Sequence, residues 1–172
     1  LVAQGGRATA SKTSGDNPAI ALMTVLGAQP LAKVVINEMT TIASVWTHNQ
    51  FVEGRAIRGQ PLQLKIAAGN VPSFVDLATG GWGTVIQDPL NSGQTPTMAN
   101  FATLADALAG CVTQVRADAC PALFAATTGP DGQAPADTLT AAEAIARAPR
   151  SHPGRGFGPL EALPPGTAGE HQ

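Results

Sequence analysis

Three ionisable side chains, Glu38, Asp76 and His48, occupy settings in which they could take part in catalysis. Glu38 follows an asparagine and precedes two threonines, and Asp76 lies just ahead of the sequence Thr79-Gly80-Gly81. Two carboxylates that face each other across a cleft can serve as general acid and base, as they do in glycosidases. One hypothesis is therefore a small secreted hydrolase, glycosidase-like or esterase-like, that works through Glu38 and Asp76.

Each of these residues also has a structural interpretation. A carboxylate in the first turn of a helix is stabilised by the helix dipole and by free N–H groups, which suits Glu38. Asp76 can bond the backbone of the glycine turn beside it, as in an Asx turn. A catalytic histidine needs a nucleophile and an orienting acid, which the sequence does not place around His48. We expect structural roles for both carboxylates and a surface or satisfied core position for His48.

The chain contains no familiar catalytic motif and no cofactor motif. There is no G-x-S-x-G elbow, S-x-x-K pair, H-E-x-x-H or P-loop. The stretch containing Trp82 and Gly83 is glycine-rich but too short for dinucleotide binding, so a tight backbone that lets Trp82 dock is the favoured interpretation. Trp82 and Gly83 remain the candidate binding loop, although two Trp and no Tyr supply few stacking surfaces for sugars or bases. We predict no cofactor and no metal.

The two cysteines, Cys111 and Cys120, are separated by eight residues. They lack C-x-x-C redox spacing, and no cluster of His or Cys completes a zinc site. They form either a disulfide or two reduced, buried thiols, and the low charge with a Thr/Ala/Gly-rich composition favours the disulfide. A cross-link over so short a loop stabilises a fold by about 2–3 kcal/mol.

Composition excludes several classes of protein. The net charge is −2 and only 13% of the residues are charged, so there is no basic field to hold nucleic acid or an anionic membrane. The apolar runs are far shorter than the roughly 20 residues that a membrane-spanning helix needs. A length of 172 residues fits one domain. We predict no nucleic-acid partner and no membrane insertion.

The elements that must position these residues read as helices. Apolar spacing and capping residues predict helices at about 17–27, 38–52, 60–75, 97–111 and 137–147, and a short one after Asp118. Pro72 predicts a kink or a split in the third helix, and the β-branched residues of 34–46 also suit a strand. The resulting fold is all-α, a small orthogonal bundle of five to six short helices with one long Gly/Pro-containing loop at 79–97. We place a flexible N-terminal arm at 1–16, the helical domain at 17–148 and a Pro/Gly-rich tail or linker at 149–172.

Residues 35–46, with the sequence VINEMTTIASVW, resemble a helical module of unknown function from secreted bacterial proteins. That module often stands ahead of NHL-like propeller repeats. Residues 17–27, 70–81, 100–111 and 137–147 resemble it as well. The resemblance implies export, and hence an oxidised Cys111–Cys120 pair, but it implies no activity. Related chains continue after the last helix with an apolar, structured segment, and the Pro/Gly-rich sequence found here suggests a piece of a longer protein.

We therefore expect an exported, non-catalytic helical module with a structural, docking or ligand-binding role. Its location would be secreted or in the cell envelope. Its partners would be neighbouring domains of a longer chain or an extracellular ligand. The alternative is the small hydrolase that uses Glu38 and Asp76.

Overall fold

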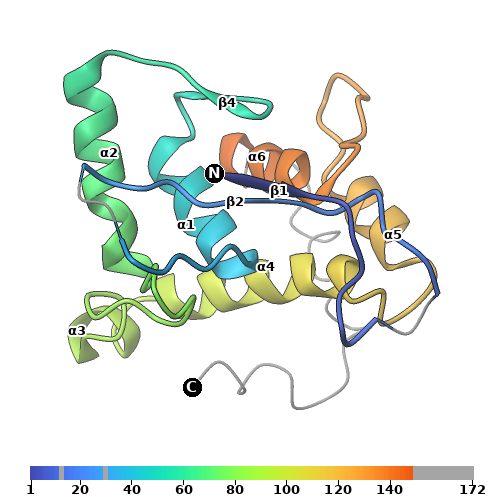
Figure 1. Ribbon diagram of the computed structural model, residues 1–172, viewed down its shortest axis with the longest axis horizontal. Helices are drawn as coiled ribbons and strands as arrows, with labels where there is room; N and C mark the ends of the chain where they lie inside the picture. The colour runs from blue at the N-terminus through green and yellow to red at the C-terminus, as the bar shows by residue number, and fades with distance from the viewer. Residues whose placement is uncertain (12–13, 29–30, 149–172) are drawn as a thin grey trace.

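The computed structural model describes residues 1–11, 14–28 and 31–148 (Figure 1). In chain order, the elements are β1 (Val2–Gln4), β2 (Ala21–Met23), α1 (Glu38–His48), β3 (Val52–Glu53), β4 (Ala56–Ile57), α2 (Pro61–Phe74), α3 (Pro89–Ser92), α4 (Thr97–Val112), α5 (Ala119–Ala126) and α6 (Thr138–Arg147). This part of the chain is mostly helical, as predicted. The prediction of an all-α fold is wrong in detail, because β1 pairs with β2 and β3 pairs with β4 in two small antiparallel sheets.

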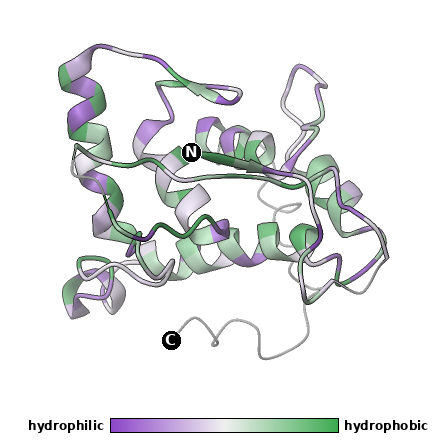
Figure 2. Cartoon of the chain, viewed as in Figure 1, coloured by the Kyte–Doolittle hydropathy of each residue, from purple (hydrophilic) through white to green (hydrophobic). Residues whose placement is uncertain are grey.

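Helix α1 occupies the middle of the molecule. It packs against α2, α4, α6 and strand β2, and Figure 1 shows these elements around it. Figure 2 shows mainly apolar colouring along α4, whereas α2 carries hydrophilic residues among its apolar ones. The core is built from the largest fully buried apolar side chains, which include Phe101, Met23, Met39, Ile42, Leu108, Leu123 and Leu139. The apolar stripes that the sequence marks on residues 38–48 and 97–112 therefore meet each other.

The helix predicted at residues 17–27 is instead a strand. All three residues of β2 are buried, and Val2 of β1 lies opposite Met23. Gly5 N–H extends the pairing by donating to the carbonyl of Ile20 at 2.8 Å. Part of the segment expected to be a flexible arm, residues 1–16, is thus paired in a sheet.

Threonines on two helices explain why this segment is extended. Met23 N–H donates to Thr41 Oγ1 on α1 at 3.0 Å, and Ala21 N–H donates to Thr138 Oγ1 on α6 at 3.0 Å. The Thr138 hydroxyl donates in turn to the Ala21 carbonyl at 2.6 Å. Buried backbone groups must be paired, and here side chains distant in sequence pair the groups that a helix would have paired internally.

The helix predicted from residue 38 exists and has a strong N-terminal cap. The Asn37 side chain accepts from Thr40 N–H at 2.9 Å, and Thr40 Oγ1 accepts from Asn37 N–H at 2.9 Å. This capping box satisfies two donors that a helix start leaves free, and it outweighs the β-branched residues of this stretch. The helix ends at His48, earlier than predicted, because the chain turns into the β3–β4 hairpin at Gly54, where φ is +63°.

The other helices largely follow the prediction. Helix α2 is one helix rather than two, and it ends two residues beyond Pro72. The long loop at 79–97 contains the short helix α3. The sulfur atoms of Cys111 and Cys120 lie 2.08 Å apart, so the predicted disulfide joins the end of α4 to the start of α5. The predicted tail at 149–172 lies outside the described residues.

Candidate functional site

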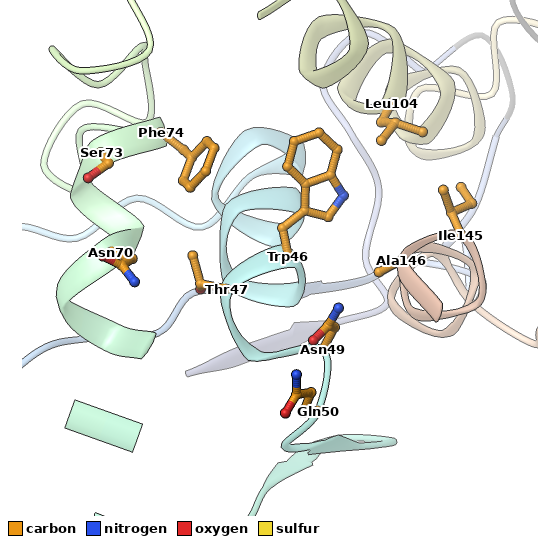
Figure 3. Close-up of a pocket in the computed structure, with 10 residues that line it drawn as sticks. All are labelled: Trp46, Thr47, Asn49, Gln50, Asn70, Ser73, Phe74, Leu104, Ile145 and Ala146. Atoms are coloured by element: carbon orange, nitrogen blue, oxygen red, sulfur yellow. The ribbon is translucent and has the colours of Figure 1, made fainter. Parts of the chain in front are cut away.

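A groove of about 800 Å³ opens between α1, α2, α4 and α6 (Figure 3). This volume falls within the range of about 300–1,000 Å³ that is typical of small-molecule sites. Five apolar side chains line it, and these are Trp46, Phe74, Leu104, Ile145 and Ala146. Five polar side chains complete the lining, and these are Thr47, Asn49, Gln50, Asn70 and Ser73. Four helices, separated by up to 100 residues of sequence, therefore build one hollow.

The half-buried indole of Trp46 lies at the centre of the groove. Its ring is nearly perpendicular to that of Phe74, at 89° with 6.0 Å between centroids, and to that of Phe101, at 87° and 5.4 Å. Such edge-to-face pairs add about 0.5–1.5 kcal/mol each beyond area burial. Figure 3 shows Phe74 on one side of the indole, with Leu104 and Ile145 on the other. The aromatic contacts fix the indole in place while part of it remains open to the groove.

The polar side chains of the groove carry no charge, and most are unpaired. Among the described residues, the side chains of Asn49, Gln50, Asn70 and Ser73 make no hydrogen bond. Their polar atoms are open to solvent, since the buried unpaired side-chain atoms of the described residues belong to Thr24 and Glu143. The exception is Thr47, whose hydroxyl donates to the Ala43 carbonyl at 2.9 Å. The groove thus presents free amide and hydroxyl groups above an apolar floor.

His48 points into the core and does not line the groove. It is 1% exposed, and its Nδ1 lies 3.0 Å from the Ser44 carbonyl and 2.8 Å from Thr47 Oγ1, so the ring is bonded within its own helix. Desolvation by burial lowers the pKa of the imidazole, although the bond to Ser44 opposes that shift. A neutral, internally bonded imidazole is suited to packing rather than to proton transfer with a substrate.

Glu38 and Asp76 lie on adjoining segments of the chain. Val35 N–H donates to the Leu77 carbonyl at 2.9 Å, and Asn37 Nδ2 donates to the Gly80 carbonyl at 3.0 Å. Glu38 is half-buried at the first position of α1, where Asn37 supplies the cap. Neither carboxylate lines the groove, so the two predicted catalytic residues and the groove are separate features of the structure.

The Asp76 carboxylate is exposed and is bonded to the turn that follows it. Its Oδ1 accepts from Ala78 N–H at 2.8 Å, and its backbone carbonyl accepts from Gly80 N–H at 2.7 Å. The bond from Ala78, aided by bonds from Thr79, lowers the pKa of Asp76 below its ordinary value. This is the geometry of an Asx turn, and a carboxylate with a lowered pKa is a poor general acid.

The glycine-rich loop around Trp82 is docked on the protein. Gly83 N–H donates to the Phe74 carbonyl at 2.9 Å, and a Cβ atom on Gly83 would lie 2.6 Å from the carbonyl oxygen of Pro72. The Trp82 ring packs against Phe101 with 5.6 Å between centroids. The close backbone approach explains the glycine and places Trp82 on the core.

A second group of carboxylates, Glu143 and the N-cap residue Asp137, belongs to α6 and its start. Glu143 is 4% exposed, and its Oε1 atom is buried without a hydrogen-bond partner. Desolvation raises its pKa, whereas Arg147, with 3.5 Å between Nη1 and Oε2, opposes the shift. Asp137 caps Thr140 N–H at 2.8 Å and pairs with Arg55 of the hairpin at 3.1 Å. The i, i+4 spacing of Glu143 and Arg147 is the sequence signal for this cluster, which holds the hairpin to α6.

The described residues contain neither a metal cluster nor a membrane-spanning helix. Within residues 1–11, 14–28 and 31–148, no group of three or more His, Cys, Asp or Glu side chains is placed to hold a metal ion. Over the same ranges, no helix combines the length and the apolar character needed to cross a membrane.

Comparison of the chain with protein-family models, with curated proteins and with solved structures finds no match. The resemblance to the secreted bacterial module therefore remains a proposal.

The sequence marks none of the groove residues as a site. Trp46 lies within the helix predicted at 38–52, but no motif there points to a binding function. Asn70 and Ser73 lie three residues apart on α2, so they share one face beside Phe74. That spacing is the signal in the sequence, and it acquires meaning only when α1, α4 and α6 supply the other walls.

Proposed function

We propose that this chain is an exported, non-catalytic helical module whose groove binds an uncharged ligand. One observation carries the proposal: ten side chains from four helices and the turn after α1 line the groove, and none of them is ionisable. A largely preformed hollow with an apolar floor and a few convergent polar groups is the usual form of a ligand site. We also propose that the module contacts neighbouring domains of a longer chain. Its helices are proposed to pack as an orthogonal bundle.

The chemistry of the lining favours binding over catalysis. General acid–base catalysis needs a titratable group within hydrogen-bond reach of the substrate. The groove offers amides, hydroxyls and an indole, none of which titrates near neutral pH. The three candidate catalytic residues, Glu38, Asp76 and His48, lie elsewhere.

Export is supported by the disulfide between Cys111 and Cys120. Disulfides persist in oxidising compartments and are rare where thiols are kept reduced. A secreted or cell-envelope location, shared with the bacterial module that the sequence resembles, is consistent with this bond.

Fluorescence from Trp46 tests the binding function directly. The chain has two tryptophans, so Trp82→Phe leaves the groove indole as the only one. We expect saturable changes in its emission with members of an uncharged compound set, and none with matched anionic or cationic compounds. Circular dichroism of the variant checks that the fold is retained. Tight binding of charged compounds alone, or no response to any neutral one, would contradict the proposal.

The second candidate function is the hydrolase, which the adjoining positions of Glu38 and Asp76 favour. A screen of the parent chain against glycoside and ester substrates tests it, with Glu38→Gln and Asp76→Asn as paired variants. We expect no activity in the parent. A parental activity that disappears in both variants, with melting temperatures unchanged, would replace the binding module with the hydrolase.

A further inference from the structure

We infer that the ligand of the groove is an uncharged saccharide, a short oligosaccharide rather than a single sugar. This inference rests on the proposed binding function and names the chemical class of its ligand. It follows from four properties of the groove: the pairing state of its polar groups, its lack of charge, the absence of peptide-binding geometry, and its size.

The free polar groups match the surface of a sugar ring. Asn49, Gln50 and Asn70 each present an amide that donates and accepts, and Ser73 presents a hydroxyl that does both. Sugar hydroxyls also donate and accept, and neighbouring hydroxyls can bond the two ends of one amide. The sugar ring has apolar C–H faces as well, and these suit the floor formed by Trp46 and Phe74. A purely apolar ligand would leave four polar side chains without partners on being covered, which is costly.

Charge excludes the other common classes of small ligand. Phosphate, carboxylate and sulfate groups are held by Arg, Lys or clustered backbone N–H groups, and no Arg or Lys lines the groove. Cationic ligands need a carboxylate or an open aromatic cage, and the groove has no carboxylate. Nucleotides and acidic glycans therefore fit poorly, whereas a neutral sugar has no charged group that would lack a partner in the groove.

Peptides are disfavoured by the shape of the walls. An extended peptide pairs with an exposed strand edge, but the residues that line this groove come from helices and from the turn after α1. An amphipathic helix needs an apolar groove, and half of this lining is polar. Proline-rich segments dock on aromatic grooves, but here the two aromatic rings of the floor, Trp46 and Phe74, stand at 89° to each other.

Size and the placement of the walls favour more than one sugar unit. The volume of about 800 Å³ is near the upper end of the usual range for ligand sites. The free amides stand on two walls, Asn49 and Gln50 after α1 and Asn70 on α2, and Figure 3 shows them on different sides of the hollow. A ligand that reaches both walls spans the groove.

The test uses the full chain on an array of neutral and acidic glycans of defined structure. Fluorescence titration of the Trp82→Phe chain with cellohexaose, chitohexaose and maltohexaose follows. We expect binding to neutral glycans and a saturable change in Trp46 emission with at least one hexaose. Asn70→Ala and Gln50→Ala should each weaken that binding about 3- to 10-fold, which corresponds to one neutral hydrogen bond. The matched control is Gln63→Ala, an exposed amide on the same helix α2 that does not line the groove.

Each other outcome overturns the inference in a distinguishable way. Binding of a neutral proline-rich peptide or another uncharged compound, with no glycan bound, overturns the saccharide and leaves the binding module intact. Binding to acidic glycans alone would mean that the ligand is a charged saccharide, and this overturns the inference of an uncharged one. Glycan binding that Gln63→Ala weakens as much as Asn70→Ala does overturns the groove as its site. No response to any neutral probe overturns the inference together with the proposed function.

Discussion

Replacing Gly83 with alanine should loosen the loop that carries Trp82. A Cβ atom at this position would lie 2.6 Å from Pro72 O, 2.7 Å from Val75 N and 2.8 Å from Phe74 C. All three neighbours are backbone atoms of the end of α2 and the residue after it, so they cannot rotate aside as a side chain would. The methyl group can therefore be accommodated only if the loop moves away from α2.

The expected loss follows from the cost of overpacking. Extra methyl groups in well-packed sites cost about 1–3 kcal/mol, and three backbone contacts this close place Gly83→Ala at about 3 kcal/mol. For a domain of this size, each kcal/mol lowers the melting temperature by about 2–4 °C, so we expect a fall of about 6–12 °C. Thermal unfolding followed by circular dichroism measures the fall, and Trp emission reports any movement of Trp82.

A neighbouring glycine provides the matched control. At Gly81 a Cβ atom would meet only Thr79 Oγ1, at 3.5 Å, which is an ordinary contact. Gly81→Ala should therefore change the free energy of unfolding by less than about 0.5 kcal/mol. Equal melting temperatures for the two variants would refute the close docking of the loop.

Three further predictions concern other parts of the fold. Gly69→Ala in α2, where a Cβ atom meets nothing within 4 Å, should raise the free energy of unfolding by about 0.5–1 kcal/mol in urea titrations, and a loss would contradict the exposed helical position. Replacing Cys111 and Cys120 by alanine should lower the free energy of unfolding by about 2–3 kcal/mol without abolishing the fold. A variant with no cooperative unfolding transition would contradict this prediction. Burial raises the pKa of Glu143 above its ordinary 4.5, so its stabilising contribution is full below that pH and is lost as the pH rises through the folded value. The stability of the parent relative to Glu143→Gln should therefore fall between pH 4 and pH 8, and a rise would show that pairing with Arg147 outweighs desolvation.

The helices could be predicted from the sequence where local signals agree. Asn37 with Thr40, and Asp137 with Thr140, form capping boxes that start α1 and α6. Strand β2 could not be predicted, because its conformation depends on hydrogen bonds to threonines 18 and 117 residues away along the chain. Local periodicity carries no record of such partners, and a short buried apolar run suits a helix and a strand equally well.

The candidate site was harder to predict than the fold, because the ionisable residues that suggest catalysis lie outside the groove. Glu38 and Asp76 stand out as carboxylates, but Glu38 lies at the first position of α1, Asp76 lies in an Asx turn, and neither lines the groove. The groove residues are amides, a serine and aromatic rings, which carry no motif. Their common property is that they line one groove without any charged side chain among them. The sequence does not show this, because the residues lie far apart along the chain.

Helix α6 shows how the fold keeps the groove neutral. Residues two apart on a helix point to nearly opposite sides, so Ile145 faces the groove while Glu143 and Arg147 face away from it. Arg147 donates to the Val52 carbonyl of the β3–β4 hairpin and pairs with Glu143, so these charges are used on the face of α6 that holds the hairpin. Helix α6 thus makes a charged, structural contact on one side and lines the uncharged groove on the other. A substitution that brings charge into the groove, such as Ile145→Lys, would leave the hairpin contacts in place and remove the property on which neutral-ligand binding depends.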